Sequence, residues 1–291
     1  MSDITLSHRS ARAEVALLGG ELRAWREGGH DLLWSADARW WPRSSPVLFP
    51  IVGRLRDGRA TIDGKRFAMA VHGFAGSQVF SVRGQSTHRV ELGLISNETT
   101  RAAYPFEFDL SLAYRLHDVG LEVLLRVTNT GQCELPYAVG LHPGLRWPFA
   151  ADSAAGHGVV FERDESQLVP MITSDGLFST EQRKLPLAGR RLSLDGVLFE
   201  QEALCFLNAR SNEVRFEAPN GAAIVVRADN FSHWALWSKP GAPLLCIEAW
   251  TGHGDAEGFD GELADKPSMR RLAPGLVSEH RLNLQFEPAR L

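Results

Sequence analysis

Residues 106–116 read Phe-Glu-Phe-Asp-Leu-Ser-Leu-Ala-Tyr-Arg-Leu, with a large apolar side chain at every even position and a polar one at nearly every odd position. This period of two predicts a long β-strand that buries one face. Residues 117–120 form a turn sequence, His-Asp-Val-Gly, and residues 121–127 then alternate again. Two alternating runs around such a turn predict an antiparallel hairpin.

The same pattern recurs along the chain. Residues 214–217 and 223–226 flank Asn220-Gly221, and residues 62–65 form another tight turn. Residues 79–82 and 90–95 make a further pair of expected strands, and residues 282–286 alternate in a last strand. A short helix is expected only at residues 98–103, before Pro105. Turn residues about every ten positions favour an all-β sandwich or barrel, and we expect one domain over residues 1–291.

Composition excludes several classes of function. The 291 residues carry a formal charge of −4, so we expect neither a nucleic-acid nor a membrane partner. No uncharged apolar run is long enough to span a bilayer, and residues 1–10 lack the apolar core of a signal peptide. Three cysteines without a C-x-x-C spacing argue against a disulfide framework or a zinc site, which favours a reducing cytoplasm.

Two histidines interrupt apolar segments where a reactive group is expected. His72 precedes Gly73, which allows backbone or ligand to approach closely, and His142 ends an apolar strand at a His-Pro step that holds it rigidly. An imidazole titrates near neutral pH and can give or take a proton there. The alternative for each is a structural histidine that is satisfied by the backbone.

Glu248 interrupts one of the most apolar segments, residues 243–252. A buried carboxylate without partners costs several kcal/mol, so Glu248 must either have a partner or face a cavity. Removal from water raises the pKa of a carboxyl group and makes it a better base. A structural salt bridge is the alternative interpretation.

Weaker signals come from other side chains. Arg54 ends an apolar, proline-rich loop and either binds the hydroxyls of a ligand or pairs with an acid. His253 and Asp255 resemble half of a metal site, but the remaining ligands are lacking, so no metal is expected. Aromatic side chains in a large sandwich more often belong to the core than to a stacking surface for a ligand. The tryptophans that raise this question are Trp40, Trp41, Trp147, Trp234, Trp237 and Trp250.

Four motifs in order resemble the aldose 1-epimerase (galactose mutarotase-like) family. They are the Pro-x-Leu-Phe-Pro-x-x-Gly-Arg loop at residues 46–54, His-Gly-Phe-Ala at 72–75, His142-Pro143, and Cys-Ile-Glu-x-Trp-Thr-Gly at 246–252. The resemblance extends over residues 4–286 and implies a large antiparallel β-sandwich, the galactose mutarotase-like supersandwich, with an open sugar cleft.

The resemblance also implies roles for individual residues. Glu248 falls on the base and His142 on the acid that open and reclose the hemiacetal ring, while His72 and Arg54 hold the sugar. A further acid that binds hydroxyls falls on Glu202, with Asp229 as a competing candidate. This chemistry needs neither metal nor redox cofactor, and a small-molecule sugar is the expected partner of a monomer or homodimer.

Three departures from the family pattern keep rival functions open. Ser45 stands where asparagine is common, Ala249 where proline is common, and Gly76 where many relatives carry the arginine that resembles a phosphate ligand of sugar-phosphate mutarotases. The missing arginine argues against a phosphosugar unless Arg54, Arg56 or Arg43 compensates. The alternatives are a carbohydrate-binding or regulatory module without turnover and, because only one carboxylate stands out, a less favoured glycoside hydrolase.

Overall fold

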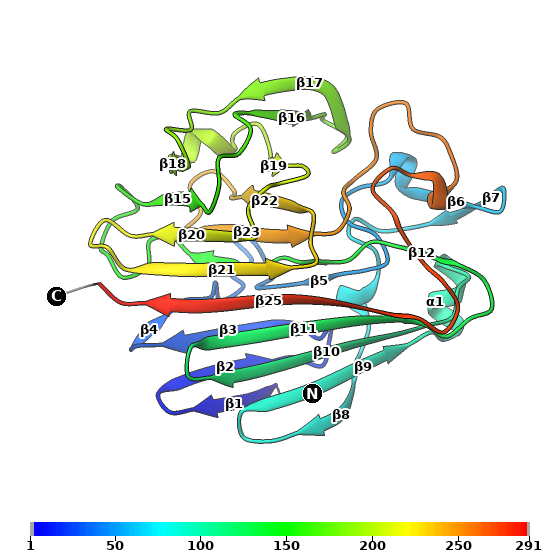
Figure 1. Cartoon of the computed structure of the whole chain (residues 1–291), viewed down its shortest axis with the longest axis horizontal. Helices are drawn as coiled ribbons and strands as arrows, with labels where there is room; N and C mark the ends of the chain where they lie inside the picture. The colour runs from blue at the N-terminus through cyan, green and yellow to red at the C-terminus, as the bar shows by residue number, and fades with distance from the viewer. Residues whose placement is uncertain (1–2, 290–291) are drawn as a thin grey trace.

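The computed structural model describes residues 3–289, and a nine-stranded antiparallel sheet dominates it (Figure 1). The alternating run at residues 106–116 supplies β10 (Phe108–His117), which pairs with β11 (Gly120–Asn129) at the predicted turn. The other strands of this sheet are, in spatial order, β18 (Arg191–Ser193), β15 (Gly158–Phe161), β20 (Glu213–Glu217), β21 (Ala223–Asp229) and β25 (Val277–Glu287) on one side of β11, and β9 (Arg89–Ile95) and β8 (Ser81–Gln85) beyond β10.

Two smaller sheets supply the other core-forming strands. One has the order β19 (Leu204–Phe206), β22 (His233–Trp237), β23 (Leu244–Trp250), β13 (Gly140–Leu141) and β5 (Val47–Leu48), with β14 (Gly144–Arg146) also paired to β23. The other runs from β1 (Ile4–His8) through β2 (Ala11–Val15) and β3 (Leu22–Glu27) to β4 (His30–Asp31). Together with the nine-stranded sheet they confirm the all-β, antiparallel sandwich.

The remaining elements are short. Three strand pairs stand apart: β12 (Leu135–Tyr137) with β24 (Arg270–Leu272), β16 (Leu168–Ile172) with β17 (Phe178–Lys184), and β6 (Arg59–Ile62) with β7 (Lys65–Ala68). The predicted helix is α1 (Glu98–Ala103), which begins at a capping box on Asn97. Single 3-10 turns are η1 (Arg56–Gly58), η2 (Ala75–Ser77), η3 (Gly196–Phe199) and η4 (Leu263–Asp265). Within residues 3–289 no helix is long and apolar enough to cross a membrane.

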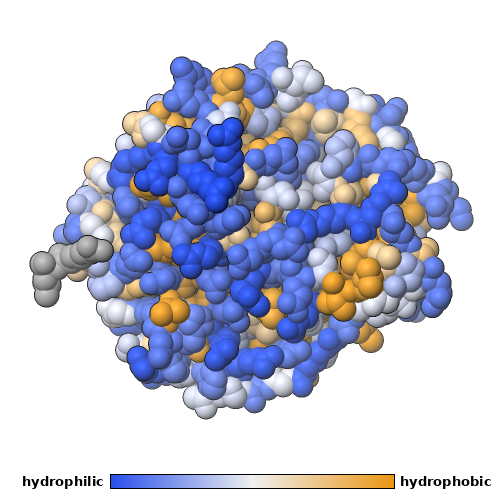
Figure 2. Space-filling view, viewed as in Figure 1, coloured by the Kyte–Doolittle hydropathy of each residue, from blue (hydrophilic) through white to orange (hydrophobic). Residues whose placement is uncertain are grey.

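The period of two decides which side chains form the core. The even positions of β10, from Phe108 to Leu116, are at most 1% exposed and pack against apolar side chains of both smaller sheets. The opposite face carries charged side chains that pair between neighbouring strands, such as Arg126 on β11 with Glu279 on β25. The face seen in Figure 2 is accordingly mostly hydrophilic.

The predicted hairpins at residues 62–65 and 214–226 are confirmed as β6–β7 and β20–β21. One predicted boundary is wrong, because the strand expected at residues 79–82 begins at Ser81. Val79 instead forms an isolated bridge with Leu18, outside the sheet, so the pairing of β8 with β9 does not extend to Val79.

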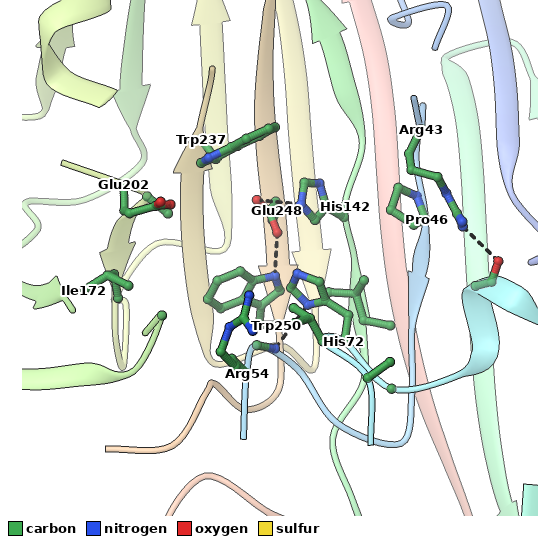
Figure 3. A pocket seen from close by; sticks show the side chains of 18 of the residues that line it. Arg43, Pro46, Arg54, His72, His142, Ile172, Glu202, Trp237, Glu248 and Trp250 are labelled. Carbon is green, nitrogen blue, oxygen red and sulfur yellow. Dashed lines mark hydrogen bonds and ion pairs between the residues drawn. The ribbon is translucent and has the colours of Figure 1, made fainter. Parts of the chain in front are cut away.

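The six-stranded sheet positions the candidate site, because one face packs into the core and the other face lines a cavity. Along β23 the odd residues Leu245, Ile247 and Ala249 point into the main core. Glu248 and Trp250 occupy even positions and therefore point to the opposite face, away from the sandwich interior. That face is covered by loops and by the β16–β17 hairpin, not by a second sheet (Figures 1 and 3).

Candidate active site

A cavity of about 570 Å³ opens on this outer face of the six-stranded sheet. That volume lies in the range of small-molecule sites. Strands β19, β22 and β23 form its floor, and residues 41–54, 70–77 and 172–178 form its walls. Figure 3 shows the polar side chains that line it, namely Arg43, Arg54, His72, His142, Glu202 and Glu248.

His142 and Glu248 meet on the floor because of strand register. The pairs Gly140–Trp250 and Leu141–Ala249 lie before them, and Gly144–Cys246 lies after them, so His142 stands opposite Glu248. Directly opposed side chains of an antiparallel pair are close neighbours. His142 Nε2 lies 3.1 Å from Glu248 Oε1, and both side chains are at least 90% buried.

Burial sets the protonation of this pair. It lowers the pKa of His142 well below its usual value, and the nearby His72 adds to that effect. Burial likewise raises the pKa of Glu248 well above the usual range of a carboxyl group. Both shifts favour uncharged side chains, so a protonated Glu248 faces a neutral His142 across the 3.1 Å contact.

His72 is fixed in one tautomer. The backbone N–H of Gly53 donates to His72 Nδ1 at 3.1 Å, so the proton of the neutral ring sits on Nε2, which is available as a donor. Burial and the positive charge of Arg54 lower the pKa of His72 to about 4, so the ring is neutral at neutral pH. A structural histidine was the alternative, and this one lines the cavity.

The loop around His72 is shaped by close backbone approach. A Cβ on Gly73 would lie 2.2 Å from the carbonyl oxygen of Phe49, and the φ of Gly73 is +76°. His72 itself has a φ of 64°, which is uncommon for a residue other than glycine. Such backbone strain clusters at functional sites, and this loop holds the imidazole at the cavity wall.

Arg54 and Glu202 stand apart from the acid–base pair in the view of Figure 3. Arg54 lies over Gly176 of the β16–β17 turn and forms no ion pair with any residue between 3 and 289. Glu202 also has a left-handed backbone, with a φ of 68°, and its carbonyl oxygen accepts a hydrogen bond from Arg183. Like Arg54, the Glu202 side chain forms no ion pair within residues 3–289, so the cavity offers a guanidinium donor and a carboxylate acceptor.

Asp229, the other candidate for the sugar-binding acid, lies elsewhere. It ends β21 opposite Arg281 of β25, in the nine-stranded sheet, and does not line the cavity. Strand pairing places it there, and Glu202 is brought to the cavity by the turn between η3 and β19.

The expectation that the tryptophans are core holds for Trp147 and Trp234. Trp250 is buried in a smaller apolar cluster and also lines the cavity, and Trp41 and Trp237 line the cavity outside the buried clusters. The Trp41 ring stacks on His142, with centroids 4.9 Å apart and planes at 26°. The Trp250 indole N–H donates to Glu248 Oε2 at 2.9 Å. Sequence reasoning missed both contacts, and the spacing of two between Glu248 and Trp250 was the available signal.

Gly76 leaves space that an arginine from another segment occupies. Arg43 Nη2 donates to the carbonyl oxygen of Gly76 at 2.9 Å, and a Cβ on Gly76 would lie 2.8 Å from the same nitrogen. The buried Glu21 lies 3.2 Å from Arg43 Nε and orients the guanidinium. Of the three arginines considered as substitutes, Arg43 and Arg54 line the cavity and Arg56 does not.

His253 and Asp255, the two residues that resemble half of a metal site, each contact another group. Asp255 pairs with Lys266, and the His253 Nδ1–H donates to the carbonyl oxygen of Gly254. In the described part of the chain, no three His, Cys, Asp or Glu side chains are grouped to hold a metal ion.

Comparisons with known proteins show which family and fold this chain resembles. The chain is 26% identical over 283 residues to the chromosomal Protein LacX of Lactococcus lactis subsp. lactis, covering 93% of this chain and 95% of that protein. The structure of a galactose mutarotase related enzyme from Lactobacillus acidophilus matches with a TM-score of 0.90 and 26% identity, covering 99% and 98% of the two chains.

A galactose mutarotase-like protein from Lactobacillus casei shares the fold, with a TM-score of 0.90, 24% identity, and coverage of 98% of this chain and 100% of that chain. The model of the family described as aldose 1-epimerase matches residues 2–263. The chain therefore belongs to the aldose 1-epimerase family.

Proposed function

We propose that this protein is a mutarotase that interconverts the α and β anomers of an aldose. The observation that carries the proposal is the opposed pair of His142 and Glu248, 3.1 Å apart on the floor of an open cavity. Mutarotation needs a base at the anomeric hydroxyl and an acid at the ring oxygen, and two positioned proton-transfer groups can supply both.

Ring opening would proceed by two coupled proton transfers. The Glu248 carboxylate takes the O1 proton, a C1–O1 double bond forms, the C1–O5 bond breaks, and O5 takes the proton of the His142 imidazolium. Rotation about C1–C2 then presents the other face of the aldehyde, and the reverse transfers close the ring. Protons and electron pairs balance within the pair and the sugar.

The carboxyl proton of Glu248 gives this uncharged pair a route to its reactive form. Transfer of that proton from Glu248 to His142, along the 3.1 Å contact, creates the carboxylate and the imidazolium without exchange with solvent. The ring-opened state returns both groups to the neutral form that burial favours. Stacking on Trp41 helps the charged imidazolium, because an indole face attracts a cation.

The other polar groups of the cavity would orient the sugar. The His72 Nε2–H and the Arg54 guanidinium donate to hydroxyl oxygens, and the Glu202 carboxylate accepts from hydroxyl groups. Holding the ring in one pose raises the rate by orientation, in addition to the proton transfers.

Polarimetry or NMR of freshly dissolved α-aldoses tests the proposal. Purified protein should accelerate the approach to anomeric equilibrium for at least one aldose, in proportion to protein concentration. Saturable sugar binding without any acceleration would replace the proposal with a carbohydrate-binding module. Release of reducing ends from an aryl glycoside would replace it with a hydrolase.

Glu202→Gln is expected to raise KM about tenfold and to leave kcat within about threefold, because a hydrogen bond to a charged group is worth roughly 1.5–3 kcal/mol. Steady-state polarimetry measures both constants. Asp229→Asn is the matched control and should change neither, since Asp229 lies outside the cavity. The assignment of Glu202 fails if the two variants behave alike.

A further inference from the structure

Trp250 and Glu248 are linked by their spacing on β23. Residues two apart on a strand emerge on the same face, so the Trp250 indole reaches the Glu248 carboxylate directly. Nε1 donates to Oε2 at 2.9 Å, and Oε1 is left facing His142 Nε2 at 3.1 Å. Each carboxylate oxygen thus has one fixed neighbour, which sets the orientation of the carboxyl group.

We propose that Trp250 is a positioning residue of this site: its indole N–H holds Oε2 of Glu248, fixes the orientation of the carboxyl group in the cavity and stabilises the carboxylate form. The inference rests on the proposed mutarotase function. Trp250 does not exchange protons in the mechanism, and it acts through Glu248.

Few side chains are placed to stabilise the carboxylate form of Glu248. Titratable neighbours of Glu248 are His142 across the strand pair, Cys205 from β19 and Cys246 on its own strand, and the other ionisable residues of the cavity are Arg43, Arg54, His72 and Glu202. Burial raises the pKa of Glu248, and the hydrogen bond from Trp250 is the interaction that lowers it again. Without the indole N–H, the equilibrium shifts further toward the neutral carboxyl form of Glu248.

Loss of this hydrogen bond has a specific kinetic consequence. In the resting pair, Glu248 carries the carboxyl proton and His142 is neutral. Loss of the carboxyl proton at high pH ends activity, because no proton is then available to convert His142 to the imidazolium. Removing the indole N–H raises the pKa of Glu248, so the alkaline limb of the pH–rate profile moves to higher pH. The plateau falls at the same time, because the carboxylate–imidazolium form becomes rarer.

Trp250→Phe keeps an aromatic ring and deletes the donor. We expect kcat to fall about tenfold, KM to stay within about twofold, and the alkaline limb of the kcat profile to rise by about one pH unit. Trp234→Phe is the matched control, because it deletes an equally buried indole donor, to the carbonyl oxygen of Ser211 at 2.8 Å, on the core face of β22. It should lower stability and leave the pH limb in place.

The Glu248 carboxyl signal in ¹³C NMR, assigned with Glu248→Gln, gives a readout that does not depend on turnover. The titration midpoint should rise in Trp250→Phe and stay unchanged in Trp234→Phe. An unchanged midpoint and pH limb in Trp250→Phe overturn the positioning role. A wild-type protein that accelerates no aldose defeats the mutarotase proposal instead, and the midpoint still decides whether the indole stabilises the carboxylate.

Discussion

Glu248→Gln is expected to slow mutarotation by about 10²–10⁴-fold, the usual contribution of a positioned acid–base group. The amide has the shape of the protonated carboxyl, accepts from the Trp250 indole and donates to neutral His142, so the cavity should keep its geometry. What it cannot do is take the O1 proton. Anomer exchange followed by NMR at saturating sugar measures the loss.

The control for this variant is Glu14→Gln, an exposed position on β2 that should leave the rate unchanged. Sugar binding to Glu248→Gln should persist, because the residues that would orient the ring are untouched. An unimpaired rate in Glu248→Gln would remove the carboxylate from the mechanism, whatever the cavity binds.

The same variant should gain stability relative to wild type as the pH rises. A carboxyl group whose pKa is raised on folding stabilises the protein below its unfolded pKa and loses that contribution as pH rises through the folded pKa. Glutamine does not titrate, so the difference in unfolding free energy between variant and wild type should grow from pH 4 to pH 8. Urea unfolding at the two pH values measures it, and a constant difference contradicts the raised pKa.

Lys266→Met should destabilise the fold by about 3–5 kcal/mol, the cost of leaving one charge of a buried pair alone. Lys266 Nζ lies 2.9 Å from Asp255 Oδ1, with the two side chains 3% and 5% exposed. Asp255 also holds the backbone on both sides of Leu55 in place, because its Oδ2 accepts from the backbone N–H of Arg56 and its own N–H donates to the carbonyl oxygen of Arg54.

Two further variants isolate the buried pair. Arg271→Met removes exposed pairs with Asp265 and Glu134 and should cost about 1 kcal/mol. Adding Asp255→Leu to Lys266→Met replaces both charges with apolar side chains and should recover much of the loss. Urea unfolding compares all three, and a cost for Lys266→Met no larger than that for Arg271→Met would contradict the importance of the buried pair.

Local patterns predicted most of the strands because each run carries its own burial signal. The even positions of β10 are buried as their spacing predicts, and the pairs β6–β7 and β20–β21 need only turn residues between neighbouring runs. The start of β8 was missed, since a bridge between Val79 and Leu18 depends on a distant segment that no local pattern contains.

Residue type also pointed to the members of the cavity. A histidine or glutamate inside an apolar run is costly to bury, so His72, His142 and Glu248 stand out before any coordinates are known. The tryptophans do not stand out in this way, because an indole suits the core as well as a cavity wall. Trp234 and Trp237 lie three residues apart on β22, and only the sheet face separates core from cavity.

The amino-acid sequence by itself determined the alternating strands, the turns between near neighbours and the few polar groups that cannot lie in a core unpartnered. Tertiary structure alone decided that His142 stands opposite Glu248, that Glu202 and not Asp229 reaches the cavity, and that Arg43 fills the space beside Gly76. The physical reason is that periodicity reports which face of a strand is buried, whereas the register between strands distant in sequence is fixed by packing of the whole sandwich.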